Sequence, residues 1–120
     1  RMVGRAAVAA DFDLDGDPDI LITACGQKPR LLRNDQATGH NWVRLNVDAP
    51  IGSTVEVHAG GLIQKQQIMP TRSYLSQGDR SLSFGLGTTE SVERIVIRKP
   101  EPDSTPVSRD TVEINRRMSL

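Results

Sequence analysis

The stretch AADFDLDGDPDILITA, residues 9–24, decides how the rest of the sequence is interpreted. It places five aspartates within nine residues and continues directly into the apolar run Ile20 to Ile22. The five aspartates are Asp11, Asp13, Asp15, Asp17 and Asp19. Neighbouring carboxylates repel by about 1 kcal/mol in water and by more near a protein surface, so something must offset this repulsion.

The spacing D-x-D-x-D-G-x-x-D suits a loop that curls around a cation. The first, third, fifth and ninth residues point carboxylates inward, and the seventh presents its main-chain oxygen. Hard oxygen ligands in that number suit calcium. Gly16 permits the sharp turn, because a residue without Cβ tolerates positive φ. We therefore predict that all five aspartates are calcium ligands, Asp17 through its carbonyl. The alternative is a solvated acidic turn without a metal.

An EF-hand loop opens with the same spacing, but the rest of the segment argues against it. An EF-hand needs a bidentate Glu at the twelfth loop position and a helix on each side. Ile22 occupies that position, and Pro18 disfavours a helix where the second one would begin. We expect strands, not helices, on both sides of the loop.

The remaining chain has the apolar period of two residues that is typical of half-buried strands, for example at Val43, Leu45 and Val47. Turn residues separate these segments at short intervals, which favours an all-β sandwich or barrel. We predict strands near residues 5–10, 19–25, 30–34, 42–48, 53–59, 62–69, 73–76, 81–85, 92–98 and 111–115. The pattern breaks at Asn34 to Asn41, so we predict a boundary there, with domains at 1–38 and 39–120.

Composition excludes several classes of function. Fifteen basic residues balance fifteen acidic ones, so no overall field attracts nucleic acid or an anionic membrane. The longest apolar run falls far short of the roughly 20 residues of a membrane helix, and residues near Arg1 lack the features of a signal peptide. Cys25 is the single cysteine. We interpret it as a small, buried apolar residue at a strand end.

Two parts of the chain resemble known families. Residues 6–24, followed by Arg30-Leu-Leu-Arg-Asn-Asp, resemble an FG-GAP/VCBS repeat, the strand, calcium loop and hairpin unit of β-propellers. The rest resembles an ASPIC/UnbV domain. The motifs that carry this second resemblance are His40-Asn-Trp-Val-Arg-Leu-Asn-Val, Ile51-Gly-Ser-Thr-Val-Glu-Val, Arg72-Ser-Tyr-Leu-Ser-Gln, Leu82-Ser-Phe-Gly-Leu-Gly and Val92-Glu-Arg-Ile-Val-Ile. This order is that of the cartilage acidic protein family and its bacterial relatives.

The resemblance implies a partial β-propeller blade, formed by the calcium-loop hairpin, packed with a small antiparallel β-sandwich. It also implies an extracellular or cell-envelope location, upstream propeller repeats in the same full-length protein, and calcium at the five aspartates. No catalytic position is carried over. One departure stands at residues 98–102, Arg-Lys-Pro-Glu-Pro, where relatives have Trp-Pro and a glycine turn.

A few other side chains have two interpretations. Trp42 and Tyr74 are either packed structural residues or exposed aromatic platforms for a ligand. The potential nucleophiles and bases are scattered and lie in no catalytic motif, so we predict that the chain is not an enzyme. They are Ser53, Ser73, Ser76, His40 and His58.

These observations lead to three hypotheses of function. The first is a non-catalytic, calcium-stabilised recognition or adhesion module of a secreted or surface protein, with an unidentified protein or glycan partner. The second is a carbohydrate-binding accessory domain of a larger secreted enzyme. The third is a structural cap that closes the end of a propeller.

Overall fold

The protein is all-β and consists of two compact units. The structure, a computed structural model, describes residues 3–36, 38–74, 76–102, 104–112, 114 and 116–119. Unit 1 comprises Arg1–Ala37 and Pro70–Asp79, and unit 2 comprises Thr38–Met69 and Arg80–Leu120. Within the described residues there is no helix, as the period of the apolar positions predicts.

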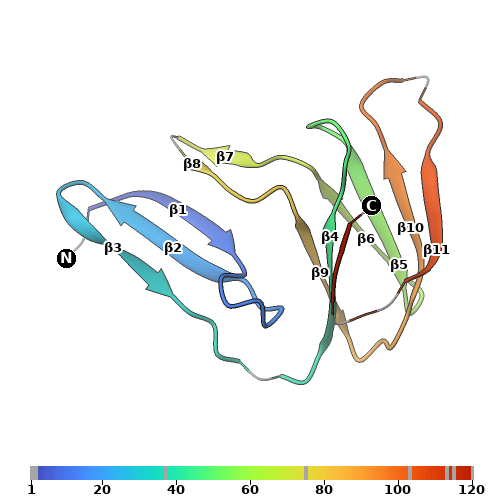
Figure 1. Cartoon of the computed structure of the whole chain (residues 1–120), viewed down its shortest axis with the longest axis horizontal. Helices are drawn as coiled ribbons and strands as arrows, with labels where there is room; N and C mark the ends of the chain where they lie inside the picture. The colour runs from blue at the N-terminus through green and yellow to red at the C-terminus, as the bar shows by residue number, and fades with distance from the viewer. Residues whose placement is uncertain are drawn as a thin grey trace. The chain divides into compact units, whose positions relative to one another are not determined.

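Unit 1 contains a three-stranded antiparallel sheet and a short hairpin (Figure 1). The sheet has the order β1-β2-β3, with β1 at Gly4–Ala10, β2 at Asp19–Ala24 and β3 at Gln27–Leu32. The hairpin joins β7 (Thr71–Ser73) to β8 (Ser76–Gln77). The backbone N–H of Gly78 donates to the carbonyl of Pro70 at 2.8 Å and closes the base of the hairpin.

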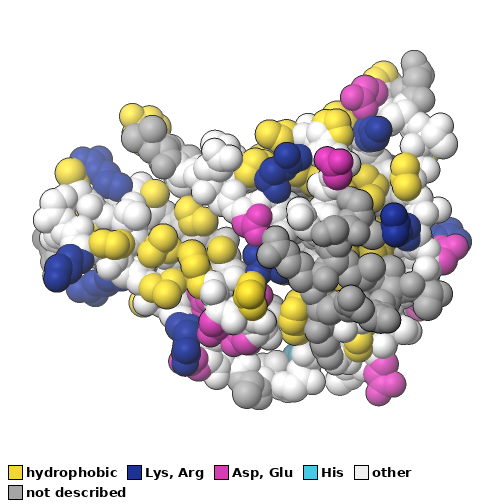
Figure 2. All heavy atoms as spheres, in the orientation of Figure 1, with side chains coloured by type: hydrophobic (Ala, Val, Ile, Leu, Met, Phe, Trp, Pro, Cys, Tyr) yellow, Lys and Arg dark blue, Asp and Glu magenta, His cyan; other side chains and the backbone are white. Residues whose placement is uncertain are grey.

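The sheet of unit 1 has apolar side chains but no buried apolar core of its own. Ile20 is 43% exposed, and Leu31 and Leu32 are each 51% exposed. Among the described residues of unit 1, none of the Val, Ile, Leu or Phe side chains is buried. Figure 2 shows apolar side chains gathered over β1–β3. Three strands with exposed apolar faces are marginally stable by themselves.

Unit 2 contains two sheets. One has the order β11-β10-β5-β6 and the other β12-β4-β9. Their bounds are β4 Asn41–Asn46, β5 Thr54–Ala59, β6 Leu62–Gln67, β9 Leu82–Gly87, β10 Val92–Arg98, β11 Val107–Val112 and β12 Arg116–Ser119. All neighbouring strands are antiparallel except β12 and β4, which are parallel. The prediction of an antiparallel sandwich is wrong at this pair, because the last strand joins the sheet next to the first strand of the unit.

Both sheets of unit 2 contribute to one hydrophobic core. Inward residues alternate along the strands, as the period of two predicts. The largest buried side chain is Phe84 on β9, which is 1% exposed. The core comprises Val43, Leu45, Val47, Ala49, Val55, Val57, Ala59, Ile68, Leu82, Phe84, Leu86, Val92, Ile95 and Ile97, with Ile114 packed against it. Val, Ile and Leu make most of this core because the chain has few aromatic residues.

Two glutamines join the edge strands of the two sheets. β6 and β9 each lie at an edge, and their backbones do not pair with each other. The side-chain amide of Gln64 donates to the carbonyl of Gly85 at 2.6 Å, and that of Gln66 donates to the carbonyl of Ser83 at 2.7 Å. These bonds occupy carbonyls that would otherwise be open to another chain. We call these two bonds the glutamine seam.

The outer face of the larger sheet carries a buried carboxylate. Glu56 on β5 is 8% exposed although it points away from the core. Its Oε1 lies 2.9 Å from Lys65 Nζ and 3.2 Å from Arg98 Nε, and its Oε2 lies 3.7 Å from His58 Nε2. The hydrogen bond from Lys65, assisted by Arg98, lowers the pKa of the Glu56 carboxyl below its ordinary value.

The structure differs from the predicted strands at three places. Ser73 ends β7 and Ser76 begins β8, so the strand predicted at 73–76 is interrupted at Tyr74 in the turn, and β3 begins at Gln27, earlier than predicted. The strand predicted at 111–115 overlaps the observed β11 only at residues 111–112, and β12, which follows Ile114, was not predicted. No helix in the described part of the chain has the length and apolar character that crossing a membrane requires.

Candidate metal site

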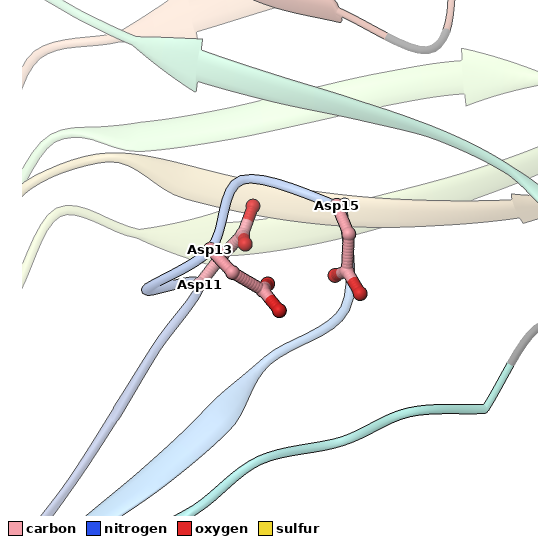
Figure 3. Close-up of side chains that lie close together, drawn as sticks. All are labelled: Asp11, Asp13 and Asp15. Carbon is pink, nitrogen blue, oxygen red and sulfur yellow. The ribbon is translucent and has the colours of Figure 1, made fainter.

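The acidic loop connects β1 to β2 and brings three carboxylates together. Asp11, Asp13 and Asp15 each offer one oxygen, and these oxygens lie within 4.8 Å of one another. Figure 3 shows the three side chains on the same turn of the loop. Strands flank this loop on both sides, so the expectation that it is not an EF-hand is confirmed.

The backbone of the loop turns sharply at two residues. Gly16 has φ of 102°, which confirms the prediction that a residue without Cβ makes this turn. Leu14 has φ of 65° and is the single non-glycine residue with positive φ among the described residues. Its side chain is 63% exposed. The positive φ of Leu14 is not predictable from the sequence, because this conformation is uncommon for a bulky residue.

Backbone N–H groups of the loop donate hydrogen bonds to two of the aspartates. The N–H of Gly16 donates to Oδ2 of Asp11 at 3.3 Å, and Asp11 is 7% exposed. The N–H of Asp17 donates to Oδ1 of Asp15 at 3.0 Å. These bonds hold the first and fifth residues of the loop in their orientations.

Asp19 has a structural contact on each oxygen. Its Oδ2 accepts the N–H of Phe12 at 2.9 Å, and its Oδ1 accepts the N–H of Asn34 at 2.8 Å. The side chain is 1% exposed. The hydrogen bonds from Asn34 and Phe12 lower the pKa of this carboxyl. Asp19 therefore ties the loop to the segment that follows β3, and its role as a metal ligand stays a prediction, as does that of the Asp17 carbonyl.

Arg33, which is not among the predicted site residues, supplies a counter-charge. Its Nη1 lies 3.7 Å from Oδ2 of Asp13, and its Nε lies 2.5 Å from Oδ1 of Asp35. Loss of water around Asp13, together with the negative charges of Asp15 and Asp19, raises the pKa of the Asp13 carboxyl, and Arg33 opposes this rise. Amides and one guanidinium thus offset part of the repulsion.

The donor set fits a hard divalent cation. Two oxygens that bind one calcium ion at about 2.3–2.6 Å are at most about 5 Å apart. The three carboxylate oxygens meet this limit. Carboxylates are hard ligands, which excludes the thiolate-based sites of softer metals. The loop can therefore hold a metal ion, with Asp13 and Asp15 on its exposed side.

The aromatic candidates lie in different units. Trp42, on β4, is half-buried and lies opposite Gly85 of β9. Tyr74 lies in the turn between β7 and β8 and is 82% exposed. Their roles in ligand binding stay predictions.

Three of the residues considered for catalysis are buried or contact neighbouring groups of the fold. Ser53 is fully buried, the hydroxyl of Ser76 donates to the carbonyl of Tyr74 at 3.3 Å, and the ring of His58 faces Glu56. The interpretation of Cys25 as a buried residue is wrong: the thiol is exposed in the turn between β2 and β3, where Gly26 turns the backbone.

A model of a known protein family matches part of the chain. The family model "ASPIC and UnbV" matches residues 43–120, which covers most of unit 2 and the β7–β8 hairpin. Among curated proteins, none matches this chain.

Proposed function

The chain belongs to the ASPIC and UnbV family, and from this premise we propose that it is a non-catalytic, calcium-stabilised recognition or adhesion module of a secreted or surface protein. Its partner is a protein or a glycan. Upstream propeller repeats of the same full-length protein are the predicted neighbours of the N-terminal unit, since residues 6–24 resemble a repeat of that kind.

The observation that carries the proposal is the group of three carboxylate oxygens within 4.8 Å of one another, on a loop between two strands. A bound calcium ion neutralises these carboxylates and cross-links the loop. The chain itself holds Asp11 and Asp15 in position through the amides of Gly16 and Asp17. This pre-orientation reduces the entropy that binding must overcome.

The exposure of two ligands favours an extracellular setting. Asp13 and Asp15 face water, so an ion bound to them competes with solvent and is held weakly. Extracellular calcium modules bind with Kd of about 10⁻⁴–10⁻³ M, which matches the calcium levels at which they work. A weak site of this kind is occupied outside the cell and empty in the cytosol.

The surroundings of the candidate nucleophiles support a non-catalytic role. Ser53 lies in the core, and the hydroxyl of Ser76 is engaged with its own hairpin. His58 lies beside a carboxylate that Lys65 and Arg98 already bind. These contacts are structural, and none resembles a nucleophile and base aligned for transfer of a proton.

The test is thermal unfolding with calcium and with a chelator. Calcium bound to the native state adds RT ln(1 + [L]/Kd), about 2.7 kcal/mol at a concentration of 100 Kd. We expect Tm to rise on addition of calcium and to fall on chelation. Asp13→Ala should remove this difference, whereas the control Asp48→Ala, an exposed acid of unit 2, should retain it. Equal Tm in both conditions for the unmodified chain rejects the calcium site.

One observation favours the carbohydrate-binding alternative. Tyr74 is 82% exposed at the end of a hairpin, where its ring is available to stack on a sugar. A glycan array with the full-length protein tests this alternative. Binding that is lost in Tyr74→Ala and retained in Trp42→Phe supports it, and absence of any glycan signal rejects it.

A further inference from the structure

One face of the sheet in unit 1 is apolar and open. Residues directly opposite one another in neighbouring strands share a face, and the register places Ala9, Ile20 and Leu32 in one such row. Ala7 and Ile22 belong to the next row on the same face. Four of these five residues are exposed, and Ile22 is partly exposed. We call this surface the Ile20 face.

The edges of the same sheet are protected, so its faces are the surfaces left for association. Strand β3 carries Lys28 and Pro29, and a proline has no N–H to offer a further strand. Strand β8 lies beside β1, and a Cβ built on Gly78 lies 3.5 Å from Cγ1 of Val8. Pairing through a new strand is therefore disfavoured at both edges.

The two ends of the sheet carry opposite charges. The end with the N-terminus and the β2–β3 turn carries Arg5 and Lys28, with Arg30 next along β3. The other end carries the acidic loop, whose five aspartates outnumber Arg33, the cation that lies 3.7 Å from Asp13. Figure 2 shows basic side chains at the first end and acidic side chains near the loop.

We propose that the Ile20 face binds the same face of a second copy of this chain, with the acidic end of each copy over the basic end of the other. A two-fold axis that lies between the sheets and runs across the strands gives this arrangement, and the interface is isologous. It brings Ile20 of each copy near Ile22 of the other. The aliphatic stem of Arg30 covers Leu32 of the second copy while its guanidinium points toward the acidic loop.

The size of the face predicts a weak dimer. Three strands about 4.8 Å apart and six residues long, at about 3.3 Å per residue, give a face of about 300 Å². A standard interface covers about 800 Å² per partner. We therefore expect a Kd between micromolar and millimolar, with tighter association at low salt, because charges at the rim contribute.

The experiment is sedimentation equilibrium of the 120-residue chain in chelator, at low and high salt. Concentrations up to about 500 µM populate a dimer of submillimolar Kd. We expect a monomer–dimer equilibrium that weakens several-fold as salt rises. Ile20→Lys should remove the dimer. The matched control Leu62→Lys changes a residue of unit 2 that is 69% exposed, and it should leave the dimer unchanged.

A charge reversal tests the orientation of the two copies. Arg30→Asp should weaken the dimer several-fold, because each isologous interface contains the contact twice. Addition of Asp15→Lys to Arg30→Asp should restore it. Dimerisation of the Ile20→Lys variant overturns the proposal. A dimer whose Kd changes neither with Arg30→Asp nor with salt also overturns it. A monomer under all conditions also overturns it and leaves the Ile20 face to another occupant, such as upstream repeats.

Discussion

The chain has two phenylalanines, and replacing each of them by alanine gives a direct test of where its core lies. Phe84 is 1% exposed at the centre of unit 2, whereas Phe12 is 48% exposed on the acidic loop. Phe84→Ala removes a buried ring and leaves a cavity among branched side chains such as Val43, the residue opposite it on β4. Substitutions of this kind cost about 3–5 kcal/mol.

The loss from Phe84 is a large part of the total stability. Small domains have free energies of unfolding of about 5–15 kcal/mol. Phe12→Ala deletes a ring that is already half in water, so we expect a loss of at most about 1 kcal/mol. In urea, with m of about 1–3 kcal/mol per molar, Phe84→Ala should lower the midpoint by at least about 1 M.

The assay is urea unfolding of both variants, followed by circular dichroism for the whole chain and by Trp42 fluorescence for unit 2. The two substitutions are chemically identical, so the ratio of their losses in free energy of unfolding depends only on how buried each ring is. A loss from Phe12→Ala that equals or exceeds the loss from Phe84→Ala would refute the placement of the core in unit 2.

Three further predictions concern single side chains. In the folded state the pKa of the Glu56 carboxyl is below its ordinary 4.5. The ionised carboxylate therefore contributes its full stabilisation above pH 4.5 and loses it as the pH falls through the lowered folded-state pKa. Between pH 6 and pH 3, the urea midpoint of Glu56→Gln should fall less steeply than that of the unmodified chain. Gln66→Ala removes the bond to the carbonyl of Ser83 and should cost about 0.5–1.5 kcal/mol in urea unfolding; a variant as stable as the original chain would contradict a stabilising seam. Gly16→Ala places a Cβ at φ of 102°, so calorimetry should show weaker calcium binding, by about 1–3 kcal/mol, and unchanged affinity would contradict the need for glycine.

The period of the apolar residues was sufficient to predict most strands. Strands β5 and β10 place core residues at alternate positions, Val55 and Val57 on β5 and Ile95 and Ile97 on β10, and both strands were predicted within a residue or two. β11 was partly missed because its sequence, Val-Ser-Arg-Asp-Thr-Val, is polar inside. Its extended form comes from pairing with β10, a contact that no local pattern records.

The acidic loop was predictable from spacing, whereas the contacts that hold it were not. Asp11, Asp13 and Asp15 meet as their alternation indicates. Asp19 binds the amide of Asn34, fifteen residues later in the chain, and the two meet only because β3 folds back along β2. The ion pair between Arg33 and Asp13 depends on the same turn.

The parallel pair β12–β4 has a consequence for biosynthesis. Val43 pairs with Arg116, and Asn46 pairs with Ser119. Strand β4, the first strand of unit 2, therefore pairs on one side with β12, the last strand of that unit. The nascent chain leaves the ribosome from its N-terminus, and this sheet cannot be completed until Ser119 has emerged. Such non-local pairing is slow to form. A nonsense mutation only a few codons before Arg116 would leave one side of β4 unpaired, and the truncated product would be prone to aggregation.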